Sequence, residues 1–339
     1  MNILDLPPEL ITVCFAYLKG TDLARVAKTC SLFNEIANIE RLWQDRCSKE
    51  YGLPVDSNLK KSFKEVYGKV LHKYGFTVGL WRNSTTCYGG VVHIWYTKEG
   101  DILAEELFSQ KDVHEELKQK HLFCVSLNEN GKVVKEWLAD CLCPQPCEIY
   151  LDKDSYDSNK FCVFQEERNK SKEEKEKEKL LFLKECELRG THRELCMYKW
   201  QSYKQNQSKQ SFERIDKSRF EPVSKVPIQP GLFKGTYGGH GTEIVHLYYD
   251  SGGTCGHGQK ISGDPNVPSG EVSLRFNIAN HMVLDKEQQQ FHALRQEELD
   301  DEVKSAFNHE KMLQQPFLMP SDIHIDDRNA VCPKFCIAR

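Results

Sequence analysis

Apolar residues recur at helical spacing in the first fifty residues of the chain. Leu10, Cys14 and Leu18 lie on one face of a predicted helix that starts at Leu6-Pro7-Pro8, where proline suits the first turn. Lys19-Gly20 ends this helix, and further short helices are expected after it. So short a segment buries only a thin core, and we therefore expect it to need a partner or the rest of the chain.

The pattern changes from helical spacing to short β-rich segments after residue 75. A helix is expected in a linker at residues 51–75. Beyond it, the segments 91–96 and 121–125 lie between glycine-bearing turns and are typical of antiparallel strands. The chain is therefore predicted to be α+β, with a helical region followed by an antiparallel β-barrel-like domain at residues 76–339.

Two segments of the predicted β-domain share one pattern. Gly79-Leu80-Trp81-Arg82 leads to Tyr88-Gly89-Gly90, and Gly231-Leu232-Phe233-Lys234 leads to Tyr237-Gly238-Gly239. Each copy is followed by a β-branched strand. We interpret them as two equivalent hairpins of one barrel, with the glycines at its bends.

Polar segments interrupt the β-domain. The charged insertion at residues 165–180 predicts a solvated excursion. Apolar residues at helical spacing predict a helix over 180–203, which makes a helical insertion in the β-domain. Residues 204–220 are expected to form a polar loop, and residues 286–315 a surface helix or linker.

Composition excludes several classes of protein. Forty-six basic and fifty acidic side chains leave a formal net charge of -4, which gives no basic surface for sequence-independent binding to nucleic acid. No apolar run approaches the roughly 20 residues needed to span a bilayer, and the first residues lack the features of a signal peptide. We therefore expect no membrane association, and localisation to the cytoplasm and nucleus.

The chain contains fourteen cysteines, which are expected to be reduced thiols. Cys141, Cys143, Cys147 and Cys162 could supply four thiolates to one structural zinc ion. Their spacing is looser than that of two Cys-x2-Cys pairs, so ordinary core and surface thiols remain the alternative.

The N-terminal pattern resembles the F-box motif along its whole length. The resemblance rests on the Leu-Pro start, on Asp22-Leu23 in a second helix and on a closing Trp43. It implies an F-box at residues 1–50 that binds the adaptor Skp1, and through Skp1 the cullin-1 scaffold. The residues expected to contact Skp1 are Leu6, Pro7, Pro8, Leu10, Ile11, Phe15 and Leu18. A helical bundle buried inside the same chain is the alternative.

The remainder resembles the F-box only protein 31 family, most closely at residues 228–268. The similar segments include Gly231–Gly238, His240-Gly241 and Gly263-Asp264-Pro265-Asn266. The last of these also predicts a turn in its own right, because proline fixes φ and its neighbours favour turns. Members of this family capture the C-terminal tails of substrates, cyclin D1 among them, and of proteins that end in a carboxamide. The resemblance implies a substrate receptor for ubiquitination and proteasomal degradation, in the cell cycle and the DNA damage response, and it also points to a Cys/His zinc site near residues 141–162.

A carboxamide end offers two N–H donors, which a fixed carboxylate can accept. The resemblance therefore makes Asp264 the residue expected to read the end of the substrate. His240, Tyr237 and Lys234 are expected to form the surrounding pocket.

The segment 316–336 resembles a part of the barrel that the family follows with further strands, so we expect this chain to lack those strands. A truncated Skp1-binding protein without substrate recognition is therefore one alternative. Another is a cysteine-dependent enzyme in which Cys255 or Cys87 is activated by His257 or His240. No phosphate loop, nucleophile elbow or metalloprotease motif occurs, so we expect a receptor without catalytic activity.

Overall fold

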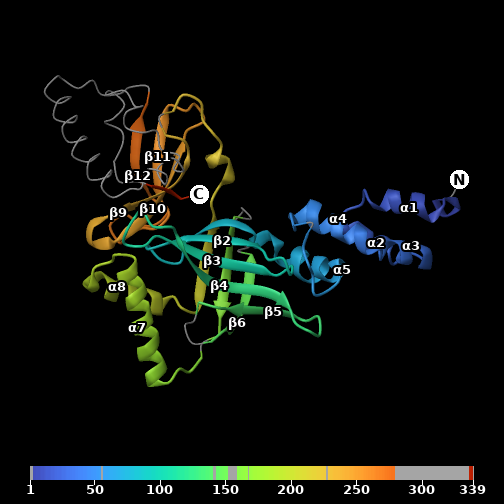
Figure 1. The fold of residues 1–339 in the computed structure, drawn as a ribbon, viewed down its shortest axis with the longest axis horizontal. Helices are drawn as coiled ribbons and strands as arrows, with labels where there is room; N and C mark the ends of the chain where they lie inside the picture. Colours follow the sequence, from blue (N-terminus) through green and yellow to red (C-terminus); the bar gives the residue numbers. More distant parts are fainter. Residues whose placement is uncertain are drawn as a thin grey trace. The chain divides into compact units, whose positions relative to one another are not determined.

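Figure 1 shows the ribbon of the computed structural model. By its internal contacts, the chain divides into two compact units. The first comprises residues Met1–Trp81, Val92–Glu106 and Lys120–Lys170, and the second Arg82–Val91, Leu107–Gln119 and Ser171–Arg339. The residues that the structure describes are 3–54, 56–139, 143–151, 159–166, 168–226, 228–278 and 336–338.

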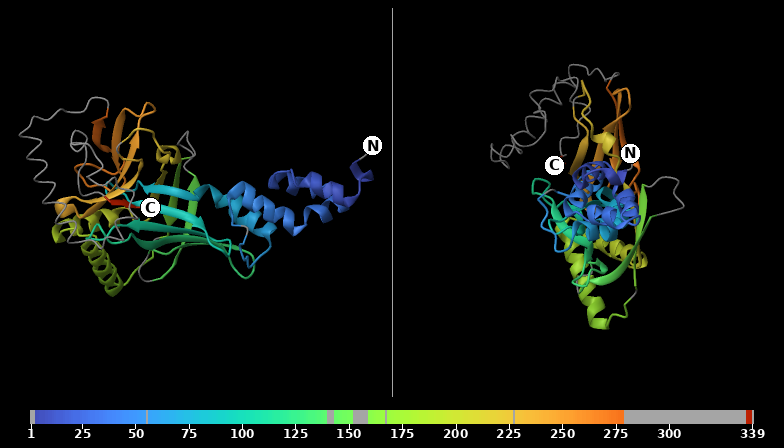
Figure 2. Two further views of the ribbon diagram at one scale, coloured as in Figure 1. Left: turned by 45° about the horizontal axis from the view of Figure 1, so that its top comes forward. Right: turned by 90° about the vertical axis from the view of Figure 1, so that its right-hand side faces the viewer.

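Short helices occupy the N-terminal end of the first unit. They are α1 (Pro8–Phe15), α2 (Gly20–Val26), α3 (Ser31–Ala37) and α4 (Glu40–Tyr51), preceded by a 3-10 turn at Ile3–Asp5. Helices α1 and α2 both pack on α3, and the two views of Figure 2 show α1 to α4 as one cluster. Pro8 occupies the first position of α1, and Gly52, with φ of 76°, ends α4 in the left-handed conformation.

The core of this helical cluster is apolar. Ile11, Phe15 and Leu23 are buried, and the ring of Phe15 meets that of Phe33 edge to face with centroids 5.2 Å apart. Trp43 is also buried, and its indole N–H donates to the carbonyl of Ala37 at 2.7 Å. The predicted helical spacing is therefore confirmed, and these side chains form the core of the cluster.

A linker of short helical segments continues from α4. It consists of α5 (Phe63–Val66), a π-helical turn (Tyr67–Leu71), α6 (His72–Tyr74) and a 3-10 turn (Gly75–Thr77). Tyr67 packs on Trp43 with ring centroids 5.1 Å apart, and its hydroxyl donates to Glu50 Oε2 at 2.7 Å. Glu50 Oε1 accepts the N–H of Gly20 at 2.8 Å. A Cβ at Gly20 would collide with the ring of Tyr67, so this close approach requires glycine.

Within the described residues, strands β1 to β8 form a closed barrel in sequential order. This confirms the predicted barrel. Trp81, Phe123 and Phe161 are buried, and the ring of Phe161 lies 4.7 Å from Trp81 and 6.2 Å from Phe123. The strands are β1 (Gly79–Asn83), β2 (Val91–Tyr96), β3 (Ile102–Phe108), β4 (Lys118–Leu127), β5 (Val133–Trp137), β6 (Gln145–Leu151), β7 (Lys160–Gln165) and β8 (Lys209–Arg214).

The charged insertion forms helix α7 (Lys172–Leu188), which is followed by α8 (Arg193–Gln205). Ser171 caps α7, because its Oγ accepts from Glu174 N at 3.1 Å and Glu174 Oε2 accepts from Ser171 N at 2.8 Å. The single helix predicted over 180–203 is therefore interrupted. Gly190, with φ of 76°, ends α7 in a conformation that favours glycine.

The prediction of a polar loop over 204–220 is wrong. This segment contains strand β8 and a 3-10 turn (Lys217–Phe220). Phe212 of β8 is fully buried, so a single apolar residue among polar neighbours anchors the strand. None of the helices in the described ranges is both long enough and apolar enough to span a bilayer.

The second unit contains a separate sheet in the order β12-β11-β10-β9-β13. Its strands are β9 (Gly231–Thr236), β10 (Thr242–Tyr249), β11 (Cys255–Lys260), β12 (Val272–Asn277) and β13 (Cys336–Ala338), with a 3-10 turn (Gly238–His240) between β9 and β10. The two segments that share the Tyr-Gly-Gly pattern therefore belong to different sheets, and their interpretation as hairpins of one barrel is wrong. The shared pattern specifies a local bend, whereas long-range pairing decides which sheet each strand joins.

Candidate functional site

An exposed apolar stripe runs along α1. Leu10, Val13 and Tyr17 are separated by three and four residues, which places them on one face of the helix and its C-terminal turn. Their exposed fractions are 51%, 55% and 85%. These three residues, the α1 stripe, give a small helical unit an apolar surface of the kind that marks interfaces.

Five of the seven residues predicted to contact Skp1 are exposed or half-buried. Pro7, Pro8 and Leu10 are exposed, and Leu6 and Leu18 are half-buried.

Two residues of the predicted Skp1-binding set do not lie on the surface. Ile11 and Phe15 are 0% and 3% exposed, so their assignment as partner-contacting residues is wrong. They lie four residues apart on the face of α1 that packs against α3, and the opposite face carries the stripe. The prediction missed Val13 and Tyr17, although counting three and seven residues on from Leu10 would have found them.

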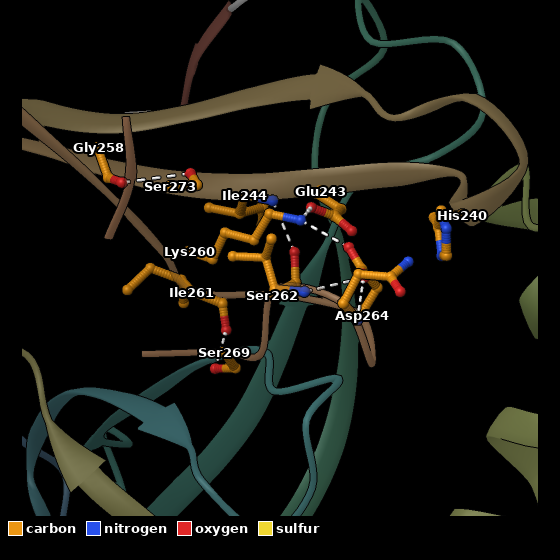
Figure 3. Close-up of polar contacts among 12 residues, drawn as sticks. His240, Glu243, Ile244, Gly258, Lys260, Ile261, Ser262, Asp264, Ser269 and Ser273 are labelled. Atoms are coloured by element: carbon orange, nitrogen blue, oxygen red, sulfur yellow. Dashed lines mark hydrogen bonds and ion pairs between the residues drawn. The ribbon is translucent and has the colours of Figure 1, made fainter. Parts of the chain in front are cut away.

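The second candidate site is a buried charged cluster at one end of the sheet β9–β12. Lys260 Nζ lies 2.7 Å from Glu243 Oε2 and 2.7 Å from Asp264 Oδ2 (Figure 3). The side chains of Lys260, Glu243 and Asp264 are only 2%, 3% and 7% exposed. These three residues, the Lys260 cluster, come from the end of β11, the start of β10 and the turn after β11.

Strand register and turn geometry bring the cluster together. Lys260 pairs with Val245 across β10 and β11, so its side chain shares a sheet face with Glu243, two residues away. Asp264 closes its own turn, because Oδ1 accepts from the N–H of Asn266 at 2.7 Å and from that of Val267 at 3.1 Å. The predicted turn is confirmed.

The ionisation of the cluster follows from these contacts. Burial opposes ionisation of Asp264, but the hydrogen bonds from Lys260 and from two backbone N–H groups outweigh it and lower its pKa to about 2. Burial raises the pKa of Glu243, and Lys260 offsets this effect only in part. The pKa of Lys260 is raised, since its two carboxylate partners outweigh its burial.

The other predicted pocket residues lie at different distances from the cluster. The ring of Tyr237 lies under Lys260, 4.6 Å from Nζ to the ring centroid. His240 ends the 3-10 turn between β9 and β10, and Figure 3 shows no drawn bond from its ring to the cluster. Lys234 pairs with Ile244, so it occupies the opposite sheet face from Glu243, where its ammonium donates to the carbonyl of Glu115. Its assignment to the same pocket is wrong.

The prediction missed Glu243 and Lys260. Glu243 stands beside the apolar residues Ile244 and Val245 of β10, which is a weak signal for a buried charge. Lys260 follows the polar residues His257 and Gln259 in β11 and carries no such signal.

The cysteines predicted to bind zinc are only partly described. Cys141 lies outside the described residues. Cys143 Sγ accepts from Gln145 Nε2 at 2.8 Å. Cys147 pairs with Gln165 and Cys162 with Tyr150 across β6 and β7, so the two thiols point to opposite faces of the sheet.

This register does not bring Cys147 and Cys162 together as ligands of one ion. Within the described ranges, no group of three or more His, Cys, Asp or Glu side chains is placed to hold a metal. Zinc binding stays a prediction.

The cysteine-enzyme alternative gains no support from the geometry. Burial raises the pKa of Cys87, which disfavours the nucleophilic thiolate. The thiol of Cys255 lies 3.9 Å from the carbonyl of its neighbour Gly256, and the ring of His257 stacks on Tyr248 with centroids 5.3 Å apart.

Comparison with known proteins assigns both regions. Residues 3–49 match the F-box-like family model, and residues 212–338 match the Cyclin D1 binding domain. The chain is 31% identical over 299 residues to F-box only protein 31 of Rattus norvegicus, and 31% identical over 301 residues to that of Homo sapiens. This chain belongs to the F-box only protein 31 family. F-box only protein 31-A of Xenopus laevis is 30% identical over 301 residues.

Membership in the F-box only protein 31 family confirms the resemblance. These alignments cover 84% of this chain but 57%, 54% and 56% of the rat, human and frog proteins, so the chain spans a little over half of their length. The α1 stripe lies in the segment matched by the F-box-like model, and the Lys260 cluster lies in the segment matched by the Cyclin D1 binding domain.

Proposed function

We propose that this chain is a substrate-receptor subunit of an SCF ubiquitin ligase, in which the F-box binds Skp1 and thereby joins the cullin-1 scaffold. The observation that carries the proposal is the α1 stripe, because more than half of each of its side chains is exposed within the segment that matches the F-box-like model. Neighbouring exposed apolar residues mark interaction sites, and tyrosine is enriched among the interface residues that contribute most binding energy.

The second unit is proposed to capture C-terminal tails of substrates, including tails that end in a carboxamide or resemble that of cyclin D1. Support comes from the position of the Lys260 cluster within the match to the Cyclin D1 binding domain. Buried charged groups on a fixed turn can distinguish a neutral amide from a charged carboxylate, because each donor and acceptor has a defined direction.

Such a receptor acts without chemistry of its own. It raises the effective concentration of substrate lysines near a ubiquitin-conjugating enzyme held by the partner subunits. We propose action in the cytoplasm and nucleus, and degradation of the captured substrate by the proteasome.

Co-purification with Skp1 tests the F-box part of the proposal. Leu10→Ala combined with Tyr17→Ala should reduce recovery of Skp1 by about tenfold or more, since it removes two side chains of the stripe. Leu180→Ala is the matched control, because Leu180 of α7 is 53% exposed against 51% for Leu10. Recovery of Skp1 with the double variant at the wild-type level would contradict the assignment.

Binding of one peptide in its amide and acid forms tests the substrate part. Fluorescence anisotropy with the wild-type chain should show tighter binding of the amide. Asp264→Asn should narrow this preference, because the loss of a charge-assisted interaction corresponds to roughly 1.5–3 kcal/mol. Equal affinity of the wild-type chain for the two peptides would refute carboxamide recognition.

A further inference from the structure

The two carboxylates of the Lys260 cluster differ in how many of their acceptor positions are occupied. A carboxylate has about four acceptor positions. Asp264 uses three of them, for Lys260 and for the N–H groups of Asn266 and Val267. The contacts of the described residues therefore leave one acceptor position of Asp264 for a ligand.

Glu243 has most of its acceptor capacity free. Its side chain is 3% exposed, Oε2 lies 2.7 Å from Lys260 Nζ, and neither oxygen has a hydrogen-bond partner of good geometry in the described part of the chain. Buried polar atoms in native proteins are almost always paired. An unpaired buried acceptor is unfavourable, so an N–H brought by a ligand would stabilise Oε1.

The cations beside Glu243 are already engaged. Lys260 donates a hydrogen bond to Asp264 Oδ2, forms an ion pair with Glu243 and lies over the face of the Tyr237 ring. Lys199, the other ammonium that interacts with Glu243, donates to Thr191 Oγ1 at 3.1 Å and lies 3.4 Å from the carbonyl of His240. A ligand must therefore bring donors rather than acceptors.

We propose that Glu243 Oε1 accepts an N–H of the terminal carboxamide of a bound tail, and that Lys260 is the positioning residue that holds the Glu243 carboxylate. The proposal rests on the proposed function of the second unit and adds the residue that reads the amide. A tail that ends in carboxylate brings no N–H at its terminus and places a second negative charge against Glu243.

The local fold is suited to this role. Glu243 is the second residue of β10, and the half-buried residues Tyr237 and His240 precede it in the connection from β9. The carbonyl of His240 accepts from Thr191 Oγ1 at 3.2 Å, and Gly239 O accepts from His192 N at 2.9 Å. This connection is therefore held by the loop between α7 and α8, and a ligand reaching Glu243 from the surface would pass beside it.

The test measures the ratio of amide to acid affinity for one peptide in both forms, by fluorescence anisotropy with the full chain. Glu243→Gln keeps the size of the side chain and lets its carbonyl face Lys260, but turns an NH2 donor toward the ligand. The ratio should fall about tenfold, which is the loss of one charge-assisted hydrogen bond. Glu271→Gln is the control, because it removes the same charge from an exposed residue close to β12.

Thermal unfolding separates binding from folding. If Glu243→Gln unfolds, Glu243→Asp keeps the charge for Lys260 and withdraws the oxygen by one methylene, so the ratio should fall without loss of the fold. A wild-type chain that does not prefer the amide overturns the proposed function. If the ratio of amide to acid affinity in the folded Glu243 variants stays within twofold of the wild-type ratio, the role of Glu243 is overturned and the proposed function is not. If the ratio falls in Asp264→Asn instead, recognition of the amide is assigned to Asp264.

Discussion

The helical cluster α1–α4 and the Lys260 cluster differ in whether their proposed binding residues are exposed or buried. In the helices, Ile11, Phe15 and Trp43 form an apolar core, and the proposed binding residues lie outside it. In the second unit, Lys260 and Glu243 are both buried and proposed to take part in binding. The F-box surface can therefore change without loss of the fold, whereas binding and stability are coupled in the Lys260 cluster.

Removal of the buried cation should give the largest effect. Lys260→Met leaves the carboxylates of Glu243 and Asp264 buried without their common partner. The free energy of unfolding should fall by about 3–5 kcal/mol. Urea unfolding measures it, with the exposed Lys217→Met as control. A loss below about 1 kcal/mol would show that the Lys260 cluster contributes little to stability. It would contradict the coupling of binding and stability that sets this cluster apart from the helices.

Acid should destabilise the second unit next most strongly. Burial, aided by the positive charge of Arg219, lowers the pKa of His246 from 6.5 to about 4. The unfolded chain then binds a proton that the folded chain does not, so stability is complete above pH 6.5 and falls as the pH is lowered to about 4. This difference corresponds to roughly 3 kcal/mol.

His246→Phe isolates the contribution of this side chain. The ring of His246 stacks on Phe220 with centroids 4.4 Å apart, so phenylalanine preserves the packing and removes the titration. Between pH 6.5 and 4, the urea midpoint should fall less for the variant than for the wild type, because the variant lacks this titrating group. Parallel pH curves for the two proteins would show that His246 does not cause the loss.

Smaller substitutions in α1 should separate stability from binding. Ile11→Val should cost about 1 kcal/mol of unfolding free energy and leave Skp1 binding unchanged, because Ile11 is fully buried. Val13→Ala should change stability by less than about 0.5 kcal/mol and weaken Skp1 binding, since Val13 is 55% exposed. Urea unfolding and Skp1 titration on both variants measure this. The reverse pattern would mean that the buried face of α1 binds the partner.

Zinc should affect only the first unit. If the predicted site exists, metal analysis should find about one equivalent of zinc, and chelation should lower the melting temperature. Because Cys147 and Cys162 point to opposite faces of the sheet, only one of Cys147→Ser and Cys162→Ser should reduce the zinc content. A metal-free chain whose stability is unchanged in chelator would refute zinc binding.

Local signals predicted more of the fold than of the site. Helical spacing correctly identified α1, and Pro265 beside Asp264 correctly identified a turn. Apolar residues occur on both faces of α1, so their spacing did not show which face would be buried. Ile11 and Phe15 were therefore placed among the partner-contacting residues although they lie in the core. Glu243 and Lys260 were missed because seventeen residues separate them and each alone resembles an ordinary surface charge.

The sequence by itself determined the elements whose causes are local: capped helices, proline-containing turns, glycine bends, and the F-box pattern that places this chain in its family. Tertiary structure alone decided that the segment 231–249 joins a sheet outside the barrel, and that Lys260 meets Glu243 across two strands. The physical reason is the range of the interactions. Backbone conformation responds to neighbouring residues, whereas strand partners and buried ion pairs depend on which surfaces the whole chain removes from water.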